Sequence, residues 1–173
     1  MKNLLTVLFL SLAVFTVTAQ ELKLNDPLPV NTRIKKGVLK NGMTYYIYKT
    51  DVIKNVASYY IIQNVGSILE NDDQQGLAHF LEHMAFNGTK NFPGKGVLNT
   101  LQKHGAVFAK DINAYTAFDE TVYNMDNIPT NVPGWIDTSL LILHDWADGL
   151  LLTDEEIDSE RGVIKEEWRT RQN

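Results

Sequence analysis

The sequence predicts an α+β sandwich, in which a mainly antiparallel sheet is covered by helices. Segments rich in β-branched and aromatic residues come first, and two helical segments close the chain. This order favours a sheet with helices against one face. A length of 173 residues and a hydrophobic content of 44% are sufficient for one domain with a core.

Charge and cysteine content exclude several classes of site. The formal net charge is -5 and no basic cluster occurs, so we expect no nucleic-acid partner. The chain has no cysteine, which excludes disulfides and thiolate ligands. Any metal ion must therefore be held by His, Asp or Glu.

The N-terminus has the pattern of a signal peptide at residues 1–19. Lys2 supplies the positive charge, residues 4–17 are apolar, and residues 17–19 form a small-residue cleavage site. A membrane anchor is the alternative, but the apolar run is shorter than the roughly 20 residues that span a bilayer. We expect an exported protein, periplasmic or extracellular, with no stable membrane anchor after cleavage. Residues 20–31 then form a lead-in segment.

Four further segments are predicted to contain strands. Residues 38–48 carry Asn-Gly at positions 41–42 between strand-like runs, which predicts a hairpin. Residues 56–65 are predicted to form a buried strand, and residues 106–113 and 115–125 two more.

Helices are predicted between and after these strands. Residues 76–86 contain no helix breaker after the first glycine. Residues 97–104 form a short amphipathic pattern closed by a glycine. Residues 132–152 have the apolar spacing of a helix packed on a sheet, and residues 153–156 form a capping box that opens the last helix.

His79, Glu82 and His83 form an H-x-x-E-H motif within the first predicted helix. On a helix, the two histidines point from the same face one turn apart, and Glu82 lies on that face too. Two such imidazoles can hold one zinc ion, and the carboxylate can reach a water bound to it. The alternative is a solvated polar stripe. The other histidines are predicted to have structural places: His104 as a helix cap or surface residue, His144 as a packing residue.

Two glutamates of the last helix share one face. Glu160 and Glu167 are seven residues apart, and Val163 and Ile164 between them are predicted to pack against the core. Burial of a charged carboxylate on the core-facing side of a helix costs free energy unless a positive group lies beside it. A zinc ion would be such a group. The pattern also fits a charged surface helix, so it leaves both interpretations open.

Residues 79–89 resemble the active-site helix of the pitrilysin-like inverzincin peptidases, a family that includes insulin-degrading enzyme and the mitochondrial processing peptidase β subunit. Residues 66–70 resemble the strand end before that helix, residues 113–116 its substrate-binding edge strand, and residues 160–167 its distal motif. The resemblance extends from about residue 32 to the C-terminus. Within the family, the chain is most similar to exported bacterial zinc peptidases.

The resemblance implies a pitrilysin-like metallopeptidase domain that binds one zinc ion per chain. His79, His83 and Glu167 would be the ligands, and Glu82 the general base that activates a zinc-bound water. Glu166 is the rival for third ligand. Glu167 keeps the seven-residue step of the family, whereas Glu166 would point about 100° away around the helix.

The resemblance also implies the substrate and the domain organisation. Glu160 would orient a ligand histidine, and Asn113 and Ala114 would hold the substrate backbone as an added strand. We expect a zinc endopeptidase acting on peptides or unfolded protein segments. Residues 32–173 would form its N-terminal catalytic domain, incomplete at the C-terminus, with a homologous second domain or subunit closing the site. The alternative is a non-catalytic peptide-binding homologue, or a fragment inactive without that second half.

Overall fold

The structure is a computed structural model that describes residue 27 and residues 29–171. The chain divides into two compact units, Met1–Thr50 and Asp51–Asn173. The predicted signal peptide, residues 1–19, lies outside the described residues. In the part that is described, no helix has the length and apolar character needed to cross a membrane.

The first unit contains the predicted hairpin. β1 (Ile34–Val38) pairs antiparallel with β2 (Thr44–Tyr48). At the turn Gly42 has a φ of +90°, a conformation that glycine adopts without strain, and the Asn41 side chain accepts a hydrogen bond from the Met43 N–H at 3.1 Å. The Asn-Gly turn is confirmed, although the first strand lies earlier than predicted.

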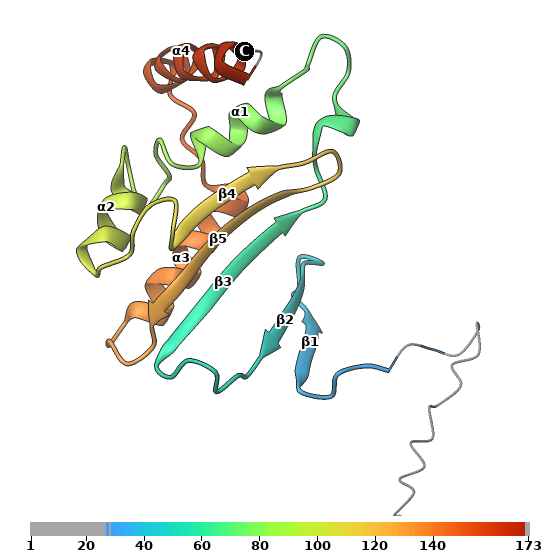
Figure 1. The fold of residues 1–173 in the computed structure, drawn as a ribbon, viewed down its shortest axis with the longest axis vertical. Helices are drawn as coiled ribbons and strands as arrows, with labels where there is room; N and C mark the ends of the chain where they lie inside the picture. Colours follow the sequence, from blue (N-terminus) through green and yellow to red (C-terminus); the bar gives the residue numbers. More distant parts are fainter. Residues whose placement is uncertain (1–26, 28, 172–173) are drawn as a thin grey trace, which may run out of the picture. The chain divides into compact units, whose positions relative to one another are not determined.

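The second unit contains a three-stranded antiparallel sheet (Figure 1). β3 (Val56–Gln63) and β4 (Ile112–Thr116) both pair with β5 (Thr121–Pro129), so the strand order is β3-β5-β4. All pairings are antiparallel, as predicted. β4 is an edge strand of this sheet.

Helices and one short 3-10 turn complete this unit: η1 (Ser67–Leu69), α1 (Leu77–Met84), α2 (Gly96–Lys103), α3 (Trp135–Asp148) and α4 (Asp154–Arg171). Each of the four α-helices lies within a predicted helical segment or within one residue of it. The Thr153 hydroxyl accepts the Glu156 N–H at 3.4 Å, which is one half of the predicted capping box.

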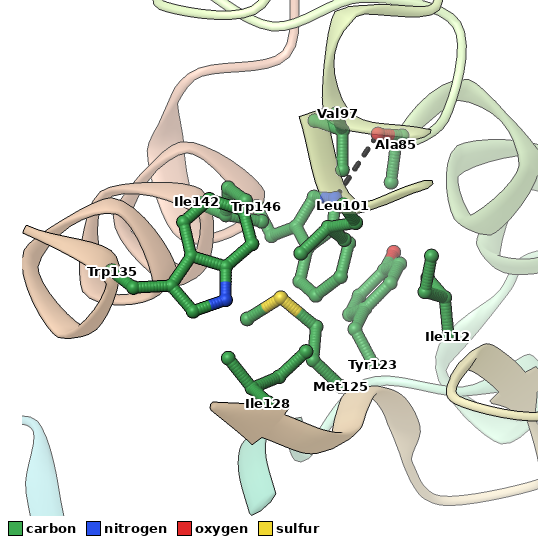
Figure 2. Packing of buried hydrophobic residues seen from close by; sticks show 10 residues of the cluster. All are labelled: Ala85, Val97, Leu101, Ile112, Tyr123, Met125, Ile128, Trp135, Ile142 and Trp146. Atoms are coloured by element: carbon green, nitrogen blue, oxygen red, sulfur yellow. Dashed lines mark hydrogen bonds between the residues drawn. The ribbon is translucent and has the colours of Figure 1, made fainter. Parts of the chain in front are cut away.

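One hydrophobic core joins α2, α3, β4 and β5 to the residue that ends α1 (Figure 2). Its buried members are Ala85, Val97, Leu101, Ile112, Tyr123, Met125, Ile128, Trp135, Ile142 and Trp146. The Trp146 Nε1–H donates to the Ala85 carbonyl at 3.1 Å (Figure 2). The core therefore fixes the C-terminal end of α1.

The strand predictions need three corrections. β3 is not a fully buried strand, because Tyr60 and Ile62 on one face are 54% and 60% exposed. Residues 106–111 form no strand and end in a turn at residues 109–111, because the Asp111 carboxylate accepts the Val107 N–H at 2.9 Å and competes with strand pairing. The segment predicted as one strand at 115–125 is interrupted by a turn between β4 and β5.

The predictions that His144 and Val163 pack against the core are wrong. The His144 side chain is 69% exposed, because it lies two residues, or about 200° of helix rotation, from both Ile142 and Trp146 in the core. Val163 is 49% exposed, whereas Ile164 is half-buried. No described residue of α4 is fully buried. By contrast, His104 is the C-terminal cap of α2, as predicted.

Asp145 joins α3 to the loop that follows α1. Its fully buried carboxylate accepts the Thr89 hydroxyl at 2.7 Å, and the Asn91 backbone N–H and side-chain amide at 2.8 and 2.7 Å. Burial by itself raises the pKa of this carboxyl group, but the hydrogen bonds outweigh it and the pKa lies below its usual value.

Asp145→Asn is therefore expected to lower the free energy of unfolding by about 2 kcal/mol at neutral pH, because it removes hydrogen bonds to a charged group. The folded-state pKa lies below the unfolded one, so this contribution is present above about pH 4 and is lost on acidification. Denaturant unfolding across that range measures it, and the difference between the proteins should shrink at low pH.

The exposed Asp137 on the same helix supplies the control. Asp137→Asn should change stability by less than about 0.5 kcal/mol. Equal effects of the two substitutions would contradict the role assigned to the buried carboxylate.

Candidate metal centre

α1 is held at both ends. At its N-terminus the Glu70 carboxylate accepts the N–H groups of Gly76 and Ala78, each at 2.7 Å. Without Glu70, these N–H groups would have no acceptor within the helix. They lie at the positive end of the helix dipole, where a negatively charged carboxylate is stabilised. At the other end, Trp146 binds the Ala85 carbonyl. The side chains of α1 are thus presented by a rigid element.

The structure brings His79 and His83 together with Glu167 of α4. The two Nε2 atoms are 3.2 Å apart. Glu167 Oε2 lies 3.6 Å from His79 Nε2 and 3.4 Å from His83 Nε2. In the described part of the chain, this is the one group of three His, Asp or Glu side chains whose ligand atoms converge in this way.

These separations fit a zinc ion. Tetrahedral zinc with bonds of about 2.0–2.2 Å to nitrogen and oxygen places its ligand atoms about 3.3–3.6 Å apart. Two histidines and one carboxylate are also a ligand set of catalytic zinc, which leaves a fourth position open. The side chains of His79, His83 and Glu167 are 28%, 21% and 27% exposed, so water can reach the site.

Glu160 lies behind His83. Its Oε1 is 2.8 Å from His83 Nδ1, and its side chain is 12% exposed. Partial burial raises the pKa of Glu160, but the hydrogen bonds with His83 and Asn87 outweigh it and leave the pKa below its usual value. An ionised carboxylate only accepts, so Nδ1 of His83 carries the hydrogen. In the neutral ring, Nε2 then has a lone pair that faces His79 and Glu167.

The rival ligand Glu166 lies elsewhere. It forms an ion pair with Arg169, and its side chain is 59% exposed. Glu167 instead directs Oε2 toward the histidines, while its Oε1 pairs with Arg171. The geometry therefore favours Glu167 over Glu166.

The Glu82 carboxylate faces the edge strand β4. Its Oε2 accepts the Thr116 hydroxyl at 2.7 Å. Burial, together with the nearby Glu82 charge, raises the pKa of Tyr123 well above its usual value. Asn113 and Ala114 also belong to β4. The predicted base therefore contacts the strand that carries the predicted substrate-binding residues.

The contacts of three polar residues in this site were not predicted from the sequence. Thr116 binds Glu82, while Asn87 and Lys95 lie behind Glu160. Asn87 follows His83 by four residues, a spacing that could have placed it on the same face. Thr116 lies in the segment predicted as the substrate-binding edge strand, but no local pattern indicates its contact with Glu82. Lys95 carries no local signal, because only the fold brings it to the site.

Comparison with known proteins identifies the family to which the chain is similar. The family model for insulinase (peptidase family M16) matches residues 45–173. A probable zinc protease PqqL from Haemophilus influenzae is 37% identical over 171 residues, covering 99% of this chain but 18% of the relative. The chain thus spans less than a fifth of that relative's length.

Solved structures share the fold. The first half of the periplasmic protease PqqL from Escherichia coli superposes with a TM-score of 0.80 and 40% identity, over 84% of this chain and 31% of that one. Pitrilysin superposes with a TM-score of 0.67 at 24% identity, over 80% of this chain and 14% of its own, which supports the fold alone.

Glu167→Gln is expected to weaken zinc binding by more than about 100-fold, because removal of a ligand costs more than the 10–100-fold typical of outer partners. Glu166→Gln is the matched control and should change the Kd less than about twofold, because its carboxylate faces solvent. Competition with a zinc chelator measures both. The reverse ranking would reassign the ligand to Glu166.

Proposed function

The chain belongs to the insulinase family, peptidase family M16, and we propose that it carries the zinc-binding part of the active site of a zinc-dependent endopeptidase. The observation that supports this most is the convergence of His79, His83 and Glu167 at separations that suit tetrahedral zinc. These three side chains would hold one zinc ion per chain.

Three further side chains of the site, those of Glu82, Thr116 and Glu160, have roles in peptide hydrolysis. When bound, zinc supplies Lewis acidity, which lowers the pKa of a coordinated water and polarises the peptide carbonyl. Glu82 takes the proton as the water oxygen attacks the carbonyl carbon, and returns it to the amine when the C–N bond breaks. The Thr116 hydroxyl orients the Glu82 carboxylate. Glu160 holds His83 in the tautomer that leaves Nε2 available.

The substrate is a peptide or an unfolded protein segment that adds to the sheet along β4. An edge strand presents unpaired backbone groups, which a peptide strand can bind. β4 is the edge strand of the β3-β5-β4 sheet in the described part of the chain, and it carries Asn113 and Ala114. A peptide lying there passes the side of α1 that presents Glu82.

Closure of the site requires a second domain or subunit of the same fold. The relatives extend far beyond the matched region, and one solved neighbour is described as the first half of a protease. On this proposal, residues 32–173 are the N-terminal part of the catalytic domain. The alternative is a peptide-binding homologue that does not cleave, or a piece that is inactive alone.

The protein is proposed to act in the periplasm. Two features support export: residues 1–19 have the pattern of a signal peptide, and the Escherichia coli neighbour is described as a periplasmic protease.

Glu82→Gln is expected to retain zinc, with a Kd within about threefold of the wild type, but to lower peptide cleavage by at least about 10²–10⁴-fold, because the amide cannot accept the proton. A quenched fluorescent peptide measures cleavage, tested on this chain and on the longest polypeptide expressed from its gene. Retained turnover would remove Glu82 from the role of base. A zinc-loaded wild-type protein that binds the peptide without cutting it would favour the non-catalytic alternative.

A further inference from the structure

A chain of polar contacts continues behind Glu160, away from the candidate metal site. Glu160 Oε2 accepts a hydrogen bond from Asn87 Nδ2 at 2.5 Å, while Oε1 meets His83 Nδ1 at 2.8 Å. Asn87 Oδ1 in turn accepts a hydrogen bond from Lys95 Nζ. The order of contacts is therefore Lys95, Asn87, Glu160, His83. It joins the N-terminal cap of α2 to α4 and α1.

The charges of Lys95 and Glu160, on either side of Asn87, allow only one orientation of the Asn87 amide. Its oxygen faces the ammonium group of Lys95, and its NH₂ group faces the carboxylate of Glu160. A flipped amide would set oxygen against carboxylate and NH₂ against ammonium, which loses both hydrogen bonds. Asn87 is 5% exposed, so water cannot easily replace either partner.

This arrangement restricts the conformation of Glu160. A glutamate side chain loses rotamer entropy when it is fixed, and one contact to an imidazole leaves the carboxylate free to rotate around it. With a donor on each oxygen, the carboxylate plane is defined. Oε1 is then directed at His83 Nδ1, and the opposite ring nitrogen points toward His79 and Glu167.

We propose that Asn87 and Lys95 are positioning residues, which fix the Glu160 carboxylate and through it the ring of His83 in the orientation that zinc binding requires. This inference rests on the proposed zinc site. The hydrogen bonds of these two side chains run to Glu160 and to each other, so both act on the metal site through Glu160. Asn87 is buried and Lys95 is exposed, so substitution of Asn87 should weaken zinc binding more than substitution of Lys95.

Zinc affinity of the variants tests the proposal. Glu160→Gln sets the scale, at about 10–100-fold weaker binding for an outer partner. Asn87→Leu, which keeps the size but removes both hydrogen bonds, should weaken binding about tenfold, and Lys95→Met about threefold. Lys95→Arg keeps a cationic donor and should restore the wild-type Kd. Lys103→Met, which removes another exposed lysine, this one within α2, should leave the Kd unchanged.

A second measurement separates positioning from stability. The ¹⁵N signals of the His83 ring in the metal-free protein report which ring nitrogen carries the hydrogen. The wild type should hold it on Nδ1, whereas Asn87→Leu and Lys95→Met should show a mixture of tautomers. A purely structural role would lower the free energy of unfolding but leave these signals unchanged. If Asn87→Leu does not fold, the exposed Lys95→Met variant still provides both measurements.

The outcomes distinguish this inference from the proposed function. A wild-type chain that binds no zinc would overturn the zinc site itself. A wild-type chain that binds zinc, with unchanged Kd and unchanged His83 signals in both variants, would overturn the positioning roles of Asn87 and Lys95 alone.

Discussion

The contact between α1 and α4 is the interaction on which the candidate site depends. α1 supplies two imidazoles, and α4 supplies Glu160 and Glu167, which meet them. No described residue of α4 is fully buried, and the two glutamates of this helix meet α1 through polar contacts with its histidines. On the proposed function, zinc adds to these contacts, and metal binding and docking of α4 are thermodynamically coupled.

Much of this arrangement was predictable from spacing. A step of four residues places His79 and His83 on one helical face, and a step of seven does the same for Glu160 and Glu167. The structure brings the two faces together. The antiparallel sheet and its helices were also predictable, because apolar periodicity changes where strands give way to helices. Local pattern was sufficient wherever one face of an element decides its packing.

The remainder depends on contacts between residues that are distant in sequence. The strand predicted at residues 106–113 was wrong for residues 106–111, because the buried Asp111 carboxylate binds a nearby backbone N–H and a side chain 16 residues away, Asn127. The packing role predicted for His144 was wrong. The apolar content of this helix does not reveal which of its faces meets the sheet, unless the position of the buried stripe is known. Lys95 joins the site through its hydrogen bond to Asn87, eight residues earlier in the chain, and no local pattern predicts this contact.

The zinc content of the purified chain after dialysis tests the central claim most directly. The account predicts one zinc ion per chain, because two imidazoles and one carboxylate already lie at the separations that tetrahedral zinc requires. Absorption spectroscopy at the zinc edge should then show nitrogen and oxygen ligands at about 2.0–2.2 Å. A chain that retains no zinc, although it is folded, would contradict the account.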